Sequence, residues 1–263
     1  MIESTYGLNE DIQPTRQQVE SSFINAVNNT LADGGKVLIP IPAVGRAQEI
    51  MMVIDHYMKS GEMVEAPVFT EGMISEASAI HESYPEYLAR ELKQKILETD
   101  DNPFDSEYFT NIEHSDAREE PMRENSPCII LATSGMLEGG PVLEYFKNIA
   151  PDTKNKVLFV SYQVNGTMGR RVLDGSKQCS MLGKEGKVEV VSVNCGVEKL
   201  DGFSGHSDYN QLMSFVQRLR PKLRRVLVNH GERSKSENLA MNIRRTYKLA
   251  AHYPQVQEAI KLF

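Results

Sequence analysis

Cysteine is scarce in this chain of 263 residues, which contains only Cys128, Cys179 and Cys195. No two of them have the C-x-x-C spacing that zinc sites and redox motifs use, so cysteine cannot build a metal cluster here. Cytosolic proteins keep such isolated thiols reduced and bury most of them in the core. We therefore expect reduced, mostly buried cysteines without a metal.

Long apolar runs are absent as well. No stretch has the roughly 20 apolar residues that a membrane-spanning helix needs. The first residues, Met1 to Thr5, carry neither the basic region nor the apolar segment of a signal peptide. We expect a soluble cytoplasmic protein, and 40% hydrophobic with 25% charged residues suits one large α/β domain or two smaller ones.

The chain also lacks an excess of positive charge, since its formal net charge is −7. This argues mildly against a protein coated with nucleic acid, although a groove can be basic in an acidic protein. The densest basic stretch runs from Arg218 to Arg225, and further cations follow at Arg233, Lys235, Arg244 and Arg245. We interpret most of these as solvated residues at helix ends, where the helix dipole favours positive charge.

Apolar periodicity predicts strands that alternate with helices, which is typical of an α/β fold with a mainly parallel sheet. Buried strands are expected at 36–41, 66–69, 127–132, 156–162, 188–193 and 226–228. Helices are expected at 15–34, 45–57, 73–97 with a break at Pro85, 141–149, one starting within 166–171, 209–219 and 234–249. The polar segment 98–124 is predicted to be an irregular surface excursion, and 194–203 a connection.

Two of the predicted strand-to-helix turns are rich in small residues. One contains Ser134 and Gly135, and the other contains Gly169, Arg170 and Arg171. Neither matches a P-loop or G-x-G-x-x-G. Backbone N–H groups at such turns can point at an anion, and guanidinium groups add charge and hydrogen bonds. Phosphate is the ligand that this combination favours, although glycine after a strand commonly serves only the turn.

A histidine stands on each side of one predicted helix and strand. His206 lies just before the helix at 209–219, and His230 ends the apolar run at 226–228 and is followed by Gly231. If the helix crosses over between neighbouring parallel strands, both histidines lie at the same carboxyl edge, where open α/β sheets keep their chemistry. Taken separately, each histidine is explained as a capping or hydrogen-bonded residue.

Six motifs occur in one order along the chain. They are Glu3-Ser4-Thr5-Tyr6-Gly7, Gly45-Arg46-Ala47-Gln48-Glu49, Ser134-Gly135-Met136, Gly166-Thr167-Met168-Gly169-Arg170-Arg171, Phe203-Ser204-Gly205-His206-Ser207-Asp208 and His230-Gly231-Glu232. The set resembles the β-CASP branch of the metallo-β-lactamase nucleases. More narrowly, it is similar to the archaeal relatives of the cleavage and polyadenylation specificity factor endonuclease, which cut RNA at 3′ ends and act in transcription termination.

The resemblance implies a domain plan as well as a fold class. Residues 1–12 would end the first metallo-β-lactamase segment, 13–190 would form a β-CASP domain of parallel-sheet βα units, and 191–263 would complete the αββα metallo-β-lactamase domain. Single-stranded RNA and the transcription machinery are the implied partners. A homodimer through the carboxyl-terminal region is also implied, with the short apolar tail 256–263 as the contact.

The resemblance also assigns roles to single residues. His230 matches a histidine that ligates one of two zinc ions, and His206 matches a histidine beside the scissile phosphate that acts as general acid or steadies the transition state. Glu3 matches the acidic residue that orients it. Histidine suits proton transfer near neutral pH. The implied RNA- and phosphate-binding residues are Arg46, Ser134, Gly135, Gly169, Arg170, Ser204 and Gly205.

The chain departs from the family in its metal ligands. The family places a His-x-His-x-Asp-His sequence, a further histidine and a bridging aspartate before the Glu-Ser-Thr-Tyr-Gly turn, and this sequence contains none of them. The remaining histidines, His56, His81, His114 and His252, stand alone. Catalytic zinc sites use three protein ligands. We therefore interpret the chain as the carboxyl part of the enzyme, inactive and without zinc by itself.

Three functions from different classes follow. The first is a metal-dependent endoribonuclease of which this chain is the substrate-clamping part. The second is a non-catalytic RNA-binding or scaffold subunit, which the presence of Glu3, His206 and His230 argues against. The third is a DNA-directed nuclease of the same superfamily, whose members tend to lack the histidine that His230 matches.

Overall fold

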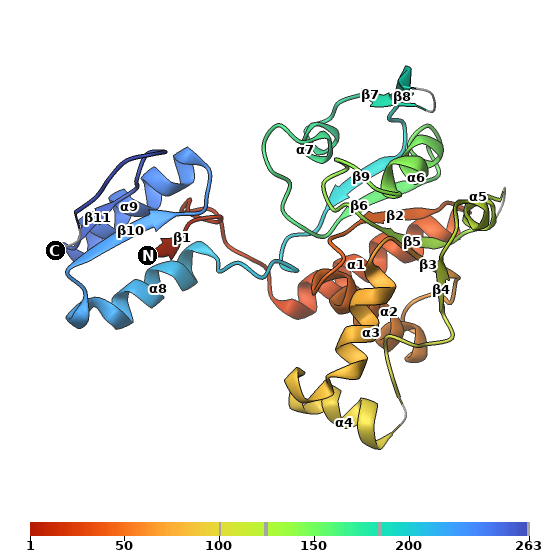
Figure 1. Ribbon diagram of the computed structural model, residues 1–263, viewed down its shortest axis with the longest axis horizontal. Helices are drawn as coiled ribbons and strands as arrows, with labels where there is room; N and C mark the ends of the chain where they lie inside the picture. Colours follow the sequence, from red (N-terminus) through yellow and green to blue (C-terminus); the bar gives the residue numbers. More distant parts are fainter. Residues whose placement is uncertain (100, 124–125, 184–185, 262–263) are drawn as a thin grey trace. The chain divides into compact units, whose positions relative to one another are not determined.

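The computed structural model describes residues 1–99, 101–123, 126–183 and 186–261, which form two compact units. A central unit spans Arg16–Phe203. A composite unit joins the two ends of the chain, Met1–Thr15 and Ser204–Phe263. Figure 1 shows each unit as a sheet with helices packed against it.

The central unit contains a six-stranded sheet in which all neighbouring strands are parallel. The strand order is β4-β3-β5-β2-β6-β9. The strands are β2 (Val37–Pro40), β3 (Val68–Glu71), β4 (Phe109–Ile112), β5 (Ile129–Ala132), β6 (Lys156–Phe159) and β9 (Gly196–Lys199). The helices are α1 (Arg16–Ala32), α2 (Arg46–Lys59), α3 (Ile74–Ser83), α4 (Arg90–Glu98), α5 (Glu119–Met122), α6 (Val142–Ile149) and α7 (Met168–Leu173), with short 3-10 turns at Pro85–Tyr87 and Ser115–Arg118.

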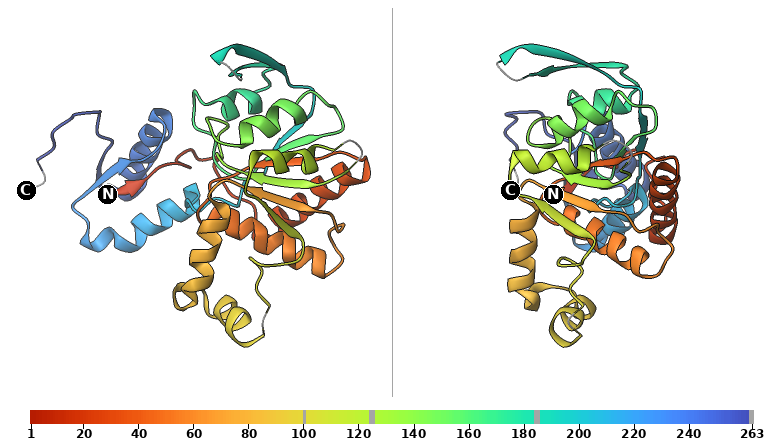
Figure 2. Two further views of the ribbon diagram at one scale, coloured as in Figure 1. Left: turned by 45° about the vertical axis from the view of Figure 1, so that its right-hand side comes forward. Right: turned by 90° about the vertical axis from the view of Figure 1, so that its right-hand side faces the viewer.

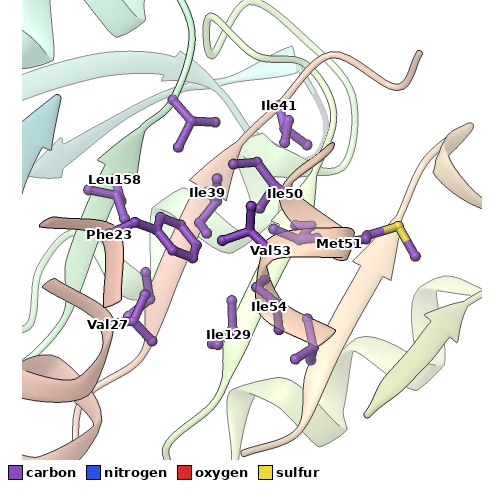
Figure 3. Packing of buried hydrophobic residues seen from close by; sticks show 14 of the residues in the cluster. Phe23, Val27, Ile39, Ile41, Ile50, Met51, Val53, Ile54, Ile129 and Leu158 are labelled. Atoms are coloured by element: carbon purple, nitrogen blue, oxygen red, sulfur yellow. The ribbon is translucent and has the colours of Figure 1, made fainter. Parts of the chain in front are cut away.

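Helices cover both faces of this sheet, as Figures 1 and 2 show, with α1 and α2 on one face and α6 and α7 on the other. Successive residues of a strand point to opposite faces, so Ile39 packs with the α1–α2 side and Leu38 with the α6 side. Figure 3 shows Ile39 beside Phe23 of α1 and Ile50 of α2. Strands buried on both faces read as continuous apolar runs, which is why the sequence predicts β2 and β5 clearly.

Several predictions for the central unit were wrong in detail. The segment 98–124 is not wholly irregular, because it contributes β4, an edge strand paired with β3. The predicted connection 194–203 contains β9, the opposite edge strand, paired with β6. The predicted strand at 188–193 exists as β8 (Val188–Ser192), but it pairs antiparallel with β7 (Gln178–Leu182) in a separate hairpin.

The composite unit contains a smaller parallel sheet of three strands in the order β1-β10-β11. Its strands are β1 (Ile2–Glu3), β10 (Arg225–Asn229) and β11 (Ala250–His252), and its helices are α8 (Tyr209–Leu219) and α9 (Arg233–Tyr247) with a 3-10 turn at Arg220–Lys222. Apolar residues of α8, α9 and the three strands form one core. The sheet therefore forms only when the two ends of the chain meet.

Helix α8 begins as its sequence predicts. Asp208 is the N-cap, its carboxylate accepts a hydrogen bond from the Gln211 N–H at 2.8 Å, and the Gln211 side chain accepts one from the Asp208 N–H at 3.0 Å. This reciprocal capping box satisfies two backbone donors at the helix start. It fixes the backbone two residues after His206.

The predicted crossover between neighbouring strands is wrong for α8. The strand before it, β9, belongs to the six-stranded sheet, whereas the strand after it, β10, belongs to the three-stranded sheet. The strand beside β10 that carries Glu3 is β1, from the start of the chain. The histidines are therefore brought together by pairing of the chain ends.

The end of the chain, 253–261, has no helix or strand. Polar contacts attach it to the composite unit: His252 Nε2 lies 2.9 Å from Glu258 Oε1, and Arg225 donates to the Lys261 carbonyl at 3.0 Å. Val256 is 95% exposed, so it contributes no apolar packing. Leu262 and Phe263, part of the predicted dimer contact, lie outside the described residues. Among the described residues, no helix is both long enough and apolar enough to cross a membrane.

Candidate active site

Backbone pairing between β1 and β10 builds the framework of the candidate site. Glu3 lies opposite Asn229, the residue before His230. The Ser4 hydroxyl donates to the Asn229 carbonyl at 2.8 Å, and the Thr5 hydroxyl donates to the His230 carbonyl at 3.1 Å. The turn after β1 therefore holds the backbone on both sides of the His230 peptide.

His230 has a left-handed backbone, with φ of 52°. A non-glycine residue pays roughly 1–2 kcal/mol for this conformation, which persists only where the surroundings impose it. The next residue must be small, because a Cβ at Gly231 would lie 2.4 Å from the Ser4 carbonyl oxygen. The close contact between the β1 turn and Gly231 thus fixes where the His230 side chain leaves the backbone.

His206 is oriented by Glu3. Its Nδ1 lies 2.8 Å from Glu3 Oε2, and the other carboxylate oxygen accepts the Ser207 N–H at 3.1 Å. Because a carboxylate only accepts, the pairing assigns the Nδ1 proton to His206 and leaves Nε2 for another partner. Gln13 adds a second restraint, since its amide donates to the His206 carbonyl at 2.9 Å. The imidazole is held on both its ring and its backbone.

The two predicted histidines lie together at the carboxyl edge of the three-stranded sheet. Their ring centroids are 5.4 Å apart, with planes inclined by 36°. The His206 side chain is 38% exposed and the Glu3 side chain 26% exposed, so the pair opens to solvent. A cavity of about 580 Å³ adjoins Glu3 and Ser207. An exposed imidazole with one fixed nitrogen can exchange a proton with a bound substrate.

Zinc does not fit the donor atoms that the described residues offer by themselves. Among the described residues, no group of three His, Cys, Asp or Glu side chains is placed to hold a metal ion. His206 directs Nδ1 to Glu3, and His230 is a single donor. Catalytic zinc requires three protein ligands and an open position.

Other predicted residues lie at the carboxyl edge of the central sheet. The strands β5, β2 and β6 are neighbours, and the turns that follow them carry Ser134 with Gly135, Arg46, and Gly169 with Arg170, respectively. Because parallel strands end at the same edge, these turns lie along one side of the sheet. We call this side the central carboxyl edge.

The backbone amides of these turns are engaged within the chain. The Ser134 N–H donates to the Gly139 carbonyl at 3.1 Å, and the Gly169 N–H donates to the Met136 carbonyl at 2.9 Å. The Glu138 carboxylate accepts the Met168 N–H at the start of α7. These three N–H groups are therefore engaged in hydrogen bonds within the chain, and anion binding by the two turns stays a prediction.

The two arginines of this edge have carboxylate neighbours on their own helices. Arg46 pairs with Glu49, and Arg170 Nε lies 2.9 Å from Asp174 Oδ2. The Arg170 side chain is 35% exposed and that of Asp174 is 57% exposed, so solvent screens the second pair. A phosphate would have to compete with these carboxylates for the guanidinium groups.

The remaining predicted RNA-binding residues, Ser204 and Gly205, belong to the composite unit. The Ser204 hydroxyl accepts the His206 N–H at 3.2 Å, and Gly205 lies between them in the same turn. Their observed contact is with the histidine backbone. The seven predicted residues are thus divided between the two compact units.

Sequence reasoning missed two polar arrangements. Gln163, 2% exposed, donates to the carbonyls of Gly135 at 2.9 Å and Ser161 at 3.1 Å, so it ties the turn after β5 to the segment after β6. Glu71 at the end of β3 accepts hydrogen bonds from the Arg118 guanidinium and from the Tyr145 hydroxyl. A glutamate that ends an apolar strand was the available signal for the second arrangement.

Comparison with protein-family models gives two matches. The Beta-Casp domain matches residues 47–172, and the Zn-dependent metallo-hydrolase RNA specificity domain matches residues 190–254. The first match lies in the central unit, and the second contains both His206 and His230.

Similar curated proteins agree with these matches. The chain is 80% identical over 263 residues to transcription termination factor FttA of Cenarchaeum symbiosum, covering all of this chain and 41% of that protein. It is 47% identical over 262 residues to FttA of Pyrococcus horikoshii and 44% identical to FttA of Methanocaldococcus jannaschii, covering 40% and 41% of those proteins. The chain thus spans about two fifths of the length of these relatives.

Proposed function

Because the chain belongs to the β-CASP family of metallo-β-lactamase hydrolases, we propose that it forms the substrate-clamping part of an endoribonuclease. The reaction is hydrolysis of a phosphodiester bond in RNA, and the process is 3′-end formation and transcription termination. The names of the relatives support termination, and the matched RNA specificity domain supports RNA as the substrate.

The observation that carries the proposal is the Glu3–His206 pair beside His230. Glu3 holds Nδ1 of His206 at 2.8 Å, which leaves Nε2 available to a substrate. A protonated imidazole there can donate to the leaving oxygen of the scissile bond. A positioned acid of this kind accelerates a reaction by about 10² to 10⁴.

In the proposed two-zinc enzyme, bound zinc would polarise the phosphate and activate the attacking water. His230 is the residue of this chain that we assign to a zinc ion, and the other ligands belong to a region outside the chain. The share of the relatives that the chain covers supports this division. The 263-residue chain alone is accordingly expected to cleave no RNA.

We propose further that Arg46, Ser134, Gly135, Gly169 and Arg170 contact the RNA along the central carboxyl edge, and that Ser204 and Gly205 do so beside His206. Their positions at strand and helix ends support this role, with side chains and the remaining backbone groups of the turns rather than the engaged amides as the contacts. The proposed β-CASP segment is 13–190, between hydrolase segments 1–12 and 191–263. A homodimer through the carboxyl-terminal region and recruitment by the transcription machinery complete the proposal.

The test compares His206→Ala with His252→Ala in a protein that also contains the region supplying the remaining ligands. His252 is a second exposed histidine with a glutamate partner, so its variant is a matched control. We expect His206→Ala to keep the zinc content of the parent and to lower cleavage of single-stranded RNA about 100-fold or more. His252→Ala should cleave like the parent.

Other outcomes would change the proposal. Equal cleavage by His206→Ala and the parent would remove His206 from catalysis. A parent that binds zinc and RNA but cleaves neither RNA nor DNA would be a scaffold subunit. Preferential cleavage of single-stranded DNA would identify a DNA-directed nuclease.

A further inference from the structure

Basic side chains gather at the edge of the three-stranded sheet opposite the histidines. We call this the basic edge. It consists of Arg218, Arg220, Lys222, Arg224, Arg225, Arg244, Arg245 and Lys248, all of which are exposed. Arg218 also lines the cavity that adjoins Glu3 and Ser207. The proposed nuclease mechanism uses none of them.

The topology places these residues together. Helix α8 ends at Leu219, and the 3-10 turn Arg220–Lys222 leads to Arg225 at the start of β10. Figure 1 shows α8 followed by β10. Helix α9 ends at Tyr247, just before Ala250, and Ala250 pairs with Arg225 in the parallel register of β10 and β11. The ends of both helices therefore meet at the amino-terminal edge of the sheet.

Helix dipoles account for only part of this charge. Arg218 lies in the last turn of α8, and Arg244 and Arg245 lie in the last turn of α9, where cations are favoured. The other five cations follow the helices or begin the strand. A dipole effect falls off within one turn, so it does not explain a run that continues through Arg224 and Arg225.

The basic edge carries little compensating negative charge. Within the described part of the chain, no carboxylate oxygen lies within 4.0 Å of the charged nitrogens of these eight side chains. Arg225 and Arg244 donate to the carbonyls of Lys261 and Ala251, which are neutral. Clustered cations that lack carboxylate partners repel one another, and a bound polyanion would relieve that repulsion.

We propose that the basic edge binds the phosphate backbone of single-stranded RNA at a second position, away from the histidine pair. Six of the eight residues are arginines, whose planar guanidinium groups bind phosphate through paired hydrogen bonds. All eight lie within the segment that matches the RNA specificity domain, 190–254. The choice of RNA over an acidic protein surface rests on the proposed function.

The test measures binding of a fluorescent oligouridine to the 263-residue chain over a range of salt concentrations. The double variant Arg220→Ala with Arg245→Ala removes two cations of the basic edge, and Arg90→Ala with Lys154→Ala removes two exposed cations of the central unit. Both doubles change the net charge equally. We expect the first to weaken binding about tenfold and to reduce the slope of log K against log[salt] by about 1.4, since each single-strand contact contributes about 0.7. The second should match the parent.

Photocrosslinking with 4-thiouridine RNA gives an independent measurement, and we expect the labelled peptide to contain Arg218 to Arg225. Equal loss of binding in the two double variants would show a general charge effect and overturn the proposal. Unchanged RNA binding in the basic-edge variant would also overturn it, whether the edge serves stability alone or an acidic protein. The assay needs no cleavage, so a failure of His206 in catalysis leaves its result unaffected.

Discussion

The two parallel sheets of this protein treat the polar groups at their carboxyl edges differently. In the composite unit, Glu3 orients one exposed imidazole, and hydrogen bonds to the backbone hold the second histidine. In the central unit, the carboxylates Glu49, Asp174 and Glu71 are paired with arginines. The first arrangement leaves nitrogen atoms available for a substrate, whereas the second uses its charges mainly within the fold.

Groups at the carboxyl edges of the two sheets are suited to two different roles, proton transfer and structural support. An exposed group with one fixed contact suits proton transfer, because the remaining contact is made only with the substrate. A buried charge with several partners suits structure, because its removal leaves the partners unsatisfied. Position at a carboxyl edge therefore does not by itself distinguish a reactive site from a structural one.

The largest effect that would sharpen this comparison is expected at Glu71. Its side chain is 9% exposed and accepts from both Arg118 and Tyr145. Glu71→Gln should lower the free energy of unfolding by about 1–3 kcal/mol, since the charged acceptor that the Arg118 guanidinium and the buried Tyr145 hydroxyl share is lost. Chemical denaturation of the chain measures this. Glu49→Gln, which removes a 29% exposed partner of Arg46, is the control and should change stability by less than about 1 kcal/mol. Equal effects would break the structural half of the comparison.

A similar or smaller effect is expected at Gly169, where the turns after β5 and β6 touch. A Cβ at this position would lie 2.0 Å from Gln163 Oε1 and 2.9 Å from the Met136 carbonyl oxygen. Gly169→Ala should therefore cost about 1–3 kcal/mol of stability by overpacking. Gly139→Ala, in the turn after β5, meets nothing within 4 Å and is expected to stay within about 0.5 kcal/mol of the parent. Thermal unfolding of both variants measures these stability changes. A Gly169→Ala variant as stable as the parent would show that the turns after β5 and β6 are not rigidly joined.

The smallest expected effect is a change in RNA binding on substitution of Arg170, whose ion pair with Asp174 is partly exposed to solvent. If the central carboxyl edge contacts RNA, Arg170→Ala should reduce the salt slope of binding by about 0.7, the share of one phosphate contact. Asp174→Asn should tighten binding, because it removes the competing carboxylate. An unchanged slope in Arg170→Ala would assign this arginine to the fold alone and would extend the structural interpretation to the whole edge.

Much of the fold could be predicted from the sequence because the buried strands and amphipathic helices have clear periods. The strands β2 and β5 are buried at every position, and the break between α3 and α4 falls at Pro85 as predicted. The edge strands β4 and β9 were missed because they carry polar or charged residues that face solvent. Their assignment depends on hydrogen bonds to β3 and β6, which are distant in sequence.

The residues of the candidate site could be predicted from the sequence, but the strand pairing and loop contacts that hold them together could not. The motifs identified Glu3, His206 and His230, and the structure brings all three together. Periodicity could not show that β1 and β10 pair, because Ile2–Glu3 is too short to carry a pattern. Nor could it show that the small-residue turns use their own amides, since that depends on contacts between separate loops.

The pairing of β1 with β10 also determines when this protein can become competent during its synthesis. The first strand leaves the ribosome long before its partner, and the entire central unit is made in between. Domains fold as units while the chain emerges, so the central unit can be folded before His206 and His230 have been synthesised. A nascent chain interrupted before β10 would lack both His230 and the strand that pairs with β1, so the candidate site assembles only after β10 has been made.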